Sequence, residues 1–326
     1  MEESKQSIAL MRLNCELINI QKTDLSLAGQ HSANQDLSAK IKRVWSNKGR
    51  LAHYLRKKIK YEYYKANSHK VIDFVVPFKV RKAKDFIVDD YKDVGRGAVY
   101  TAVYGNYDVI EEPMFVNPKL DYYAFTDSDL PTETVWKRID ISKYPKLKGL
   151  DNYHRAKYIK MFPYEFLQDY DFSIWVDGNV NLIADTYPVA IMSKGSPMAT
   201  YSNPIHDCIY TEARYMIFQG RLPADGAKIQ ISDYRRDGFS EHFGMREFSI
   251  IYRDHSNKEC YDLMKEWWEH VNKYTMRDQL SLPFILWKNG KTIDYIKSLG
   301  ENWRWNPRFK VSEHKYQTMY VKTNNL

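Results

Sequence analysis

Short apolar runs with a strand pattern alternate with helical stretches along the chain from about residue 95 onward. The runs with the composition of strands are 97–103, 121–126, 135–139, 171–176, 197–200 and 248–253. Helical spacing of apolar residues is found at 151–162, 207–219 and 259–274. Because strands that alternate with helices form sheets with crossover helices, this pattern predicts an α/β domain.

The last of these helices has the clearest amphipathic pattern. Leu263, Trp267 and Val271 follow one another at intervals of four residues, and Met264 and Trp268 lie beside them in the sequence. Such spacing places apolar side chains on one face of a helix, so we expect this face to belong to the core.

The first third of the chain has a different character. Residues 40–70 contain eleven Lys or Arg and a single acid, Glu62, whereas residues 71–326 are balanced in charge. Apolar and aromatic side chains recur in this stretch at near-helical spacing: Trp45, Leu51, Leu55, Ile59 and Tyr63. The pattern predicts a basic amphipathic helix. We therefore divide the chain into an N-terminal extension, residues 1–94, and a main domain, residues 95–326.

Two interpretations of the basic helix at 40–70 stay open. It could bind an anionic membrane surface, where each nearby Lys or Arg contributes about 1 kcal/mol, and so bring the protein to a lipid-linked molecule. It could equally be a solvated helix packed beside the domain. A nucleic-acid partner is not expected, because no RNP, zinc-finger or helix-turn-helix pattern accompanies the charge.

Composition narrows the class of protein. The 326 residues are 44% hydrophobic and 28% charged, which is ordinary for a globular chain. The three cysteines match no metal or disulfide pattern, no run approaches the ~18 apolar residues of a membrane span, and no secretory signal is visible. We expect a cytoplasmic protein, which the basic helix could hold at the inner face of the membrane. Aromatic residues make up 15% of the chain and could stack on sugars or bases as well as pack in the core.

The sharpest local motif follows the strand pattern at 171–176. Asp177, Gly178 and Asn179 come directly after its apolar residues. Open α/β sheets bind ligands at the carboxyl ends of their strands, and Mg²⁺ or Mn²⁺ on a diphosphate prefers oxygen ligands. Asp177 and Asn179 are therefore candidate ligands of a metal and a diphosphate, although a plain turn after a strand would have the same sequence.

Cationic residues precede this motif on the helix predicted at 151–162. Arg155, Lys157 and Lys160 could pair with a diphosphate, for which Arg offers a planar, two-pronged donor. Charged residues on a helix are often simply solvated, and that interpretation stays open as well.

Two strand ends supply candidate groups for binding a nucleoside. After the first strand, Gly105 and Asn106 favour a tight turn, and Tyr104 and Tyr107 could flank a base, although an ordinary turn between a strand and a helix would have the same sequence. After the second strand, Asp127 could accept a hydrogen bond from a base or a ribose, or could cap a helix.

Two later clusters contain ionisable side chains. In the first, His206 and Glu212 are candidate acid, base or acceptor-binding groups, and Asp207 is placed to cap the following helix. In the second, Arg277, Asp278 and Gln279 follow the Trp-rich helix. Either cluster could instead be purely structural.

Eight segments, taken in order, resemble a glycosyltransferase-like family that was formerly of unknown function and is shared by plant mucilage-related and bacterial polysaccharide-synthesis proteins. They are VYTAVYGNYD, YYAFTD, RAKYIKMFP, SIWVDGNV, HDCIYTEA, IIYRDH, WW at 267–268 and RDQLS. The resemblance runs from about residue 96 to residue 287. It implies a GT-A-like, Rossmann-like mixed sheet flanked by helices, with the basic helical extension outside the match.

The resemblance also implies roles for single residues. The first strand and its turn would contact the nucleotide through Thr101, Ala102, Asn106 and Tyr107. Arg155, Lys157, Asp127 and Asp177 would complete the nucleotide-sugar site, with Asp177 as the main metal and diphosphate residue.

Two further roles follow from related enzymes. Asp278 and Gln279 are similar to the DQ pair of retaining GT-A enzymes, which faces the sugar and the acceptor. Asn179 stands where the DxD motif has its second carboxylate, and this departure puts strict dependence on Mn²⁺ or Mg²⁺ in doubt. A late histidine completes the metal shell in related folds, and His314 is the candidate here.

We therefore expect a glycosyltransferase, most simply a hexosyltransferase, that uses a nucleotide diphosphate sugar in surface-glycan synthesis. The acceptor would be a polysaccharide, an oligosaccharide or a lipid-linked molecule, and the DQ pair favours a retaining reaction. Two other classes stay open. One is a metal-dependent hydrolase, which no HExxH or GxSxG motif supports, and the other is a non-catalytic module that binds a glycan or a membrane.

Overall fold

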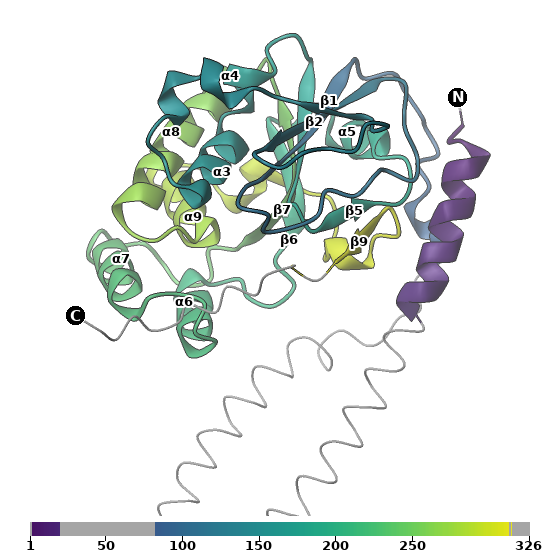
Figure 1. Ribbon diagram of the computed structural model, residues 1–326. Helices are drawn as coiled ribbons and strands as arrows, with labels where there is room; N and C mark the ends of the chain where they lie inside the picture. Colours follow the sequence, from purple (N-terminus) through teal and green to yellow (C-terminus); the bar gives the residue numbers. More distant parts are fainter. Residues whose placement is uncertain (1, 20–81, 313, 315–326) are drawn as a thin grey trace, which may run out of the picture.

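A mixed seven-stranded sheet forms the centre of the computed structural model, which describes residues 2–19, 82–312 and 314 (Figure 1). The strands lie in the order β3-β2-β1-β4-β7-β6-β8. Their bounds are β1 Gly97–Val103, β2 Leu120–Thr126, β3 Trp136–Arg138, β4 Phe172–Val176, β6 Met198–Ser202, β7 Arg246–Asp254 and β8 Ile296–Ser298. Among these strands only β7 runs antiparallel to its neighbours, β4 and β6. The α/β class with a mixed sheet is therefore confirmed.

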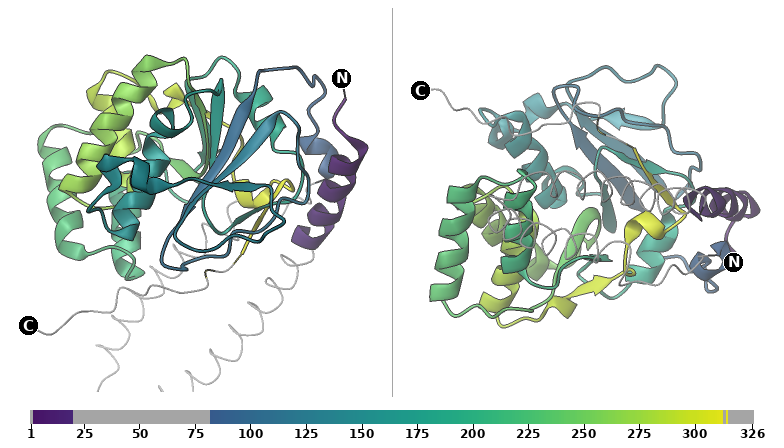
Figure 2. Two further views of the ribbon diagram at one scale, coloured as in Figure 1. Left: turned by 45° about the horizontal axis from the view of Figure 1, so that its top comes forward. Right: turned by 90° about the horizontal axis from the view of Figure 1, so that it is seen from below.

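Helices cover both faces of this sheet (Figures 1 and 2). One face has α3, α4, α8 and α9, with α6 and α7 beside them, and the other has α5. The bounds are α3 Asn152–Met161, α4 Pro163–Phe166, α5 Tyr187–Ser193, α6 Ile209–Phe218, α7 Ala224–Arg236, α8 Lys258–Lys273 and α9 Asp278–Lys288. Short 3-10 turns lie at Ala83–Phe86, Ile141–Lys143, Pro145–Leu147, Ile293–Tyr295 and Trp303–Trp305.

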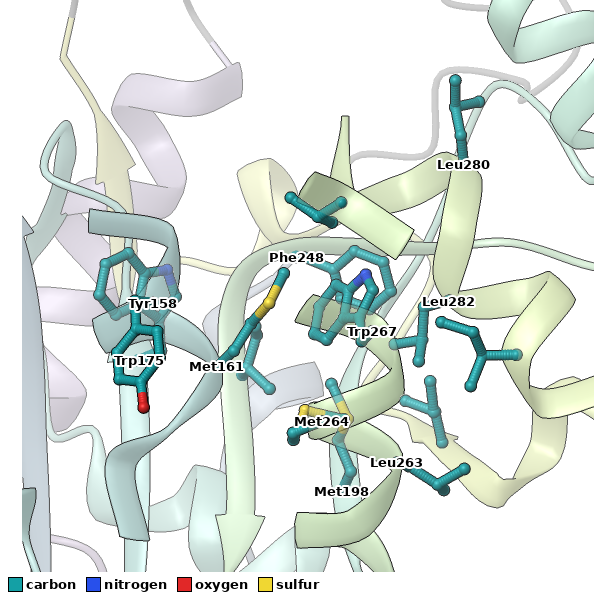
Figure 3. Close-up of a cluster of buried hydrophobic side chains, with 14 of the residues drawn as sticks. Tyr158, Met161, Trp175, Met198, Phe248, Leu263, Met264, Trp267, Leu280 and Leu282 are labelled. Carbon is teal, nitrogen blue, oxygen red and sulfur yellow. The ribbon is translucent and has the colours of Figure 1, made fainter. Parts of the chain in front are cut away.

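The largest cluster of buried hydrophobic side chains lies between one face of the sheet and the helices α8 and α9 (Figure 3). The predicted stripe on α8 is confirmed, because Leu263, Trp267 and Val271 are each at most 3% exposed. The ring of Trp267 packs on Phe248 of β7 with centroids 5.1 Å apart. The Trp267 indole also donates to the Asp278 carbonyl oxygen at 3.1 Å, which holds the start of α9 beside α8.

The six predicted strands and three predicted helices are all present, within a few residues of their expected ends. The pattern did not find α9, because Asp278 to Leu286 are buried around the whole circumference of the helix, so no amphipathic stripe exists. It also did not find α5, a seven-residue helix that begins at a proline-containing turn.

A second, two-stranded sheet joins the C-terminal segment to the turn after β4. It consists of β5, Val180–Leu182, and β9, Phe309–Val311, in antiparallel register. Beyond it, the Ser312 amide donates to the Asn179 carbonyl oxygen at 2.9 Å. Because β5 follows Asn179 directly, this sheet fixes the turn that contains the motif at 177–179.

An N-terminal helix, residues 5–19, packs on the same side of the molecule (Figure 1). The Asn14 amide donates to the carbonyl oxygens of Pro307 and Phe309 at 2.9 and 3.0 Å. Glu3, just before the helix, forms an ion pair with Arg308 in which both side chains are 0% exposed. These contacts attach the start of the chain to the segment that leads into β9.

The basic helix predicted at 40–70 lies outside the described residues, and so does most of the predicted extension 1–94. The division of the chain at residue 94 therefore stays a prediction. Among the described residues, no helix is long and apolar enough to cross a membrane.

Candidate active site at the strand ends

The candidate site lies at the edge of the sheet where β1, β2 and β4 end. Because β7 runs in the opposite direction, its first residues lie at this same edge. The Asp177 amide, directly after β4, donates to the Ser249 carbonyl oxygen of β7 at 2.9 Å. Asp177 is therefore held at the position where open α/β sheets bind their ligands.

Two lysines of α3 link Asp177 to the start of α9. The Lys160 ammonium lies 3.2 Å from Asp177 Oδ1 and 3.0 Å from Asp278 Oδ2. The Lys157 ammonium lies 2.7 Å from Asp278 Oδ2. The structure thus joins two lysines of one helix to carboxylates that lie 17 to 121 positions further along the chain.

These ion pairs determine the charge of both carboxyl groups. Burial alone would raise the pKa of Asp278, but the ammonium groups of Lys157 and Lys160 lower the pKa of this carboxyl far below its usual range. Burial would also raise the pKa of Asp177, but the ammonium groups of Lys160 and Lys157 outweigh burial and lower the pKa of this carboxyl. Both groups are therefore carboxylates at neutral pH.

Asp177 is also oriented by the strand that precedes it. The Trp175 indole donates to Asp177 Oδ1 at 2.7 Å, so this oxygen faces both the indole and Lys160. The side chain is still 32% exposed. One carboxylate oxygen is thus held by the protein while the group remains open to a ligand.

The turn after β4 lies against His314 through a residue that was not predicted, Asp108. A Cβ on Gly178 would come 3.0 Å from Asp108 Oδ2, so Asp108 lies directly against the turn. Asp108 Oδ1 in turn lies 2.8 Å from His314 Nδ1. Asp108 therefore links His314 to the turn that contains Asp177 and Asn179.

A divalent ion shared with a diphosphate was predicted at this turn. The described residues contain no cluster of three His, Cys, Asp or Glu side chains with metal-binding geometry. Asp177, the amide oxygen of Asn179 and His314 would be a small ligand set, but Mg²⁺ usually takes one or two protein ligands and fills its shell with phosphate oxygens and water. The metal assignments thus remain predictions.

The predicted nucleoside-binding residues gather at the ends of β1 and β2. Both oxygens of Asp127 accept a hydrogen bond from the Gly105 amide at 3.0 Å, so Asp127 braces this turn and does not cap a helix. Asn106 has a φ of 55°, a left-handed conformation that suits asparagine in a tight turn. The Arg155 guanidinium lies over the Tyr104 ring, 5.1 Å from its centroid.

Arg155 is therefore placed differently from the two lysines on the same helix. Its guanidinium donates to the Leu150 carbonyl oxygen at 2.8 Å and to Asn152 Oδ1 at 3.1 Å, beside the nucleoside end of the site. No contact of Arg155 with Asp177 is found among the described residues. The expected diphosphate partners are thus Lys157 and Lys160.

Thr101 and Ala102 lie within β1 and are buried, at 2% and 8% exposure. Their side chains point to opposite faces of the sheet, as successive strand residues do. The Thr101 hydroxyl has no hydrogen-bond partner in the described part of the chain. Contact of these residues with a nucleotide stays a prediction.

The His206 and Glu212 cluster is completed by Arg277, which directly precedes Asp278. Glu212 Oε2 lies 2.7 Å from His206 Nδ1, and Glu212 Oε1 lies 2.8 Å from the Arg277 guanidinium. Burial alone would raise the pKa of Glu212, but His206 and Arg277 together lower the pKa of this carboxyl. A buried, ionised and paired Glu212 is a poor proton acceptor, so this cluster holds Arg277 in place.

The predicted cap of α6 is wrong. Cys208 occupies the N-cap position without a side-chain hydrogen bond. Asp207 instead turns away from the helix and lies 2.8 Å from His242 Nδ1.

Two buried or half-buried polar groups near the site have unusual surroundings. Gln279 is 5% exposed, and its Oε1 has no hydrogen-bond partner among the described residues. Glu247, at the start of β7, was not predicted; burial raises the pKa of its carboxyl, against the effect of Arg304. Its position directly before the strand predicted at 248–253 is the sequence signal that could have identified Glu247.

The strand order and the charged edge define a GT-A-like α/β domain. The family model of the TOD1/MUCI70 glycosyltransferase-like domain matches residues 78–314. The chain belongs to this family, which confirms the resemblance found in the eight sequence segments.

Several solved glycosyltransferase structures are similar to parts of the chain. WbbM, a bifunctional glycosyltransferase, shares 12% identity over 65% of this chain and 40% of its own, with a TM-score of 0.40. Ktr4p, a mannosyltransferase from S. cerevisiae in complex with GDP, shares 15% identity over 62% of this chain and 68% of its own, with a TM-score of 0.36. GlyE of Streptococcus pneumoniae TIGR4 shares 12% identity over 64% of this chain and 45% of its own, with a TM-score of 0.34. No curated protein matches the chain.

Proposed function

We propose that this domain transfers a sugar, most simply a hexose, from a nucleotide diphosphate sugar to a glycan acceptor. The observation that carries the proposal is the cluster in which Lys157 and Lys160 join Asp278 and Asp177 at the ends of the strands. Such a cluster offers cations for a leaving diphosphate and carboxylates for a sugar at one place.

The donor would lie across this edge from β1 to α9. Its nucleoside would bind at the turn held by Asp127, beside Asn106 and Tyr107, with Arg155 and Tyr104 below. Its diphosphate would lie near Asp177 and the two lysines. Its sugar would face Asp278 and Gln279, where the unpaired Gln279 Oε1 can accept a hydrogen bond from a sugar hydroxyl.

The charge of the cluster favours a divalent ion as the companion of the diphosphate. Lys157 and Lys160 are already balanced by Asp177 and Asp278, and Arg277 is paired with Glu212. A diphosphate would therefore bring negative charge to a cluster whose described Lys and Arg side chains are already paired with carboxylates. Mn²⁺ or Mg²⁺, held by Asp177, Asn179 and His314, would neutralise the leaving group.

Asp278 is suited to stabilise positive charge on the sugar. Its low pKa keeps it ionised, and an ionised group with such a low pKa is a weak base. It would therefore face the sugar cation that forms as the diphosphate leaves. This role agrees with a retaining reaction, which the likeness to the DQ pair also favours.

The acceptor and the location in the cell belong to the same proposal. A polysaccharide, an oligosaccharide or a lipid-linked acceptor would suit a role in surface-glycan synthesis. The basic stretch at 40–70 would hold a cytoplasmic enzyme at the inner face of the membrane. Flotation with anionic liposomes tests this location, and the absence of binding even at low salt would contradict it.

The central test is Asp177→Ala. Purified wild-type protein is incubated with UDP-, GDP- and CMP-sugars, with and without a panel of glycan acceptors, and both the released nucleotide and the glycosylated product are measured. We expect Asp177→Ala to abolish transfer while the circular dichroism spectrum stays unchanged. Addition of Mn²⁺ after treatment with a chelator should restore wild-type activity only.

A matched control is Asp262→Ala, which removes an exposed carboxylate that pairs with Lys265 on α8. This variant should transfer as the wild type does. Full activity in Asp177→Ala would refute the assignment, and nucleotide release that never requires an acceptor would favour a hydrolase.

A further inference from the structure

The face of α3 that lines the site includes a third residue. Tyr153, Lys157 and Lys160 are spaced by four and three positions, which places them on one face of a helix. Their exposure falls along this face, from 48% for Tyr153 to 16% for the Lys157 side chain and 3% for the Lys160 side chain. Lys160 is thus at the floor of the site and Tyr153 at its rim.

Tyr153 also contacts the segment that leads into α9. Its hydroxyl donates to the Met276 carbonyl oxygen at 3.4 Å, two residues before Asp278. The Lys157 ammonium lies 5.7 Å from the centroid of the Tyr153 ring. The ring therefore bridges α3 and the start of α9, directly above the pair formed by Lys157 and Asp278.

The two ends of this side chain have different surroundings. Burial raises the pKa of Tyr153 to about 12, so its hydroxyl keeps its proton and its hydrogen bond. The residue as a whole is nevertheless 48% exposed. A single exposed aromatic residue is ordinary on a protein surface, but this one is fixed by its hydroxyl at the mouth of a charged site.

We propose that the exposed face of the Tyr153 ring binds a pyranose ring of the acceptor. The inference rests on the proposed function, because the charged cluster beneath Tyr153 is taken as the place of sugar transfer. Sugars present C–H groups on one face, which pack on aromatic rings, and hydroxyl groups at their edges, which pair with charged side chains. Tyr153 supplies the first surface, and Lys157 with Asp278 supplies the second.

The position on α3 separates this ring from the nucleoside end of the site. Arg155 follows Tyr153 by two residues, and residues two apart in a helix do not share a face. Arg155 lies over Tyr104 near the turn held by Asp127, whereas Tyr153 lies over the start of α9. Tyr107, at the nucleoside end, is nevertheless close enough to contribute to the raised pKa of Tyr153, so a nucleobase is the competing occupant to be tested.

The experiment measures binding, and so does not depend on turnover. Wild type, Tyr153→Ala and Tyr153→Phe are saturated with UDP and Mn²⁺ and mixed with the methyl glycosides of glucose, galactose, mannose and N-acetylglucosamine. Saturation-transfer NMR then detects which sugar protons contact the protein. Phe218→Ala is the matched control, since Phe218 is an exposed aromatic residue, 56% exposed, at the end of α6.

We expect sugar signals in the wild type, in Tyr153→Phe and in the control, and a roughly 3- to 10-fold weaker affinity in Tyr153→Ala, as for the loss of one aromatic contact. The dissociation constant of UDP should stay the same in all four proteins. Unchanged sugar binding in Tyr153→Ala, or no sugar binding in the wild type, overturns the proposal.

A loss of UDP affinity in Tyr153→Ala overturns it too and assigns the ring to the nucleobase. A failure of the proposed function would be seen separately, as sugar binding by the wild type without any transfer in the Asp177 assay.

Discussion

Two buried ion-pair networks in this molecule have similar chemistry and different surroundings. In the first, Arg308 is 0% exposed and donates to Glu3 and to the carbonyl oxygens of Asp185 and Phe86. In the second, Lys157 and Lys160 pair with carboxylates at an open edge of the sheet, and Asp177 remains 32% exposed. The first network is closed to ligands, and the second has a side that faces solvent.

The difference indicates how a structural charge cluster can be told from a functional one. The Arg308 network uses its charges to join the start of the chain to the segment before β9, with fixed planar geometry. The lysine network uses compact ammonium groups, which have three donors each and can exchange one partner for a phosphate oxygen. Breaking the first should therefore reduce stability, and breaking the second should reduce catalysis.

The largest expected effect is that of Arg308→Leu on stability. The substitution leaves the Glu3 carboxylate buried without its partner, which typically costs about 3–5 kcal/mol. Urea unfolding followed by circular dichroism measures the loss. The double variant Glu3→Leu with Arg308→Leu should recover much of the stability, because no charge is then left unpaired. Wild-type stability in Arg308→Leu would show that this network does not hold the N-terminal helix.

The next effect is that of Lys160→Met on turnover. The variant leaves Asp177 and Asp278 without the ammonium group between them, and removes positive charge from the expected place of the leaving group. We expect kcat to fall on the order of 10²- to 10³-fold, as when one preorganised electrostatic donor is removed. Initial rates at saturating donor measure this change.

The matched control for Lys160→Met is Lys146→Met. Lys146 also pairs with a carboxylate, Glu165, but its side chain is 64% exposed. Its removal should leave kcat unchanged. An equal loss of activity in both variants would contradict a special role for the cluster of Lys157, Lys160, Asp177 and Asp278.

The smallest effect concerns Glu212, which is buried as Glu3 is but lies at the edge of the site. Its pKa is lowered on folding, so the stability that it contributes is present above its ordinary pKa of 4.5 and is lost as pH falls through the lower folded value. Glu212→Gln should therefore be less stable than the wild type at pH 7, by about 1–3 kcal/mol. The gap should narrow below about pH 4.

Unfolding curves at pH 7, 5 and 3 measure this gap for Glu212→Gln. A gap of constant size across the range would contradict the ion pair with Arg277. A large fall in kcat at pH 7, with the stability unchanged, would move Glu212 from the structural class to the functional one.

The sequence pattern predicted those parts of the molecule that depend on local spacing. The strands β1, Gly97–Val103, and β4, Phe172–Val176, are mostly apolar and buried along their whole length, and α8 has a regular stripe. The motif at 177–179 is readable because it follows such a run directly. These features need only neighbouring residues for their recognition.

The parts that could not be predicted depend on contacts between distant residues. Asp108 meets His314 across 206 positions, and neither residue is marked by its neighbours. Tyr153 gains its place at the rim only because α3 lies beside the start of α9. The turn of Asp207 toward His242, instead of toward its own helix, is likewise set by packing and not by sequence position.

The bond between Glu3 and Arg308 spans 305 positions and so has a consequence for the order of folding. The N-terminal helix precedes every strand of the main sheet along the chain, whereas its partner Arg308, just before β9, follows all seven. Because contacts so distant along the chain form late, the turn at 177–179 should gain its final brace late in folding. The sheet would thus form before the candidate site at its edge is complete.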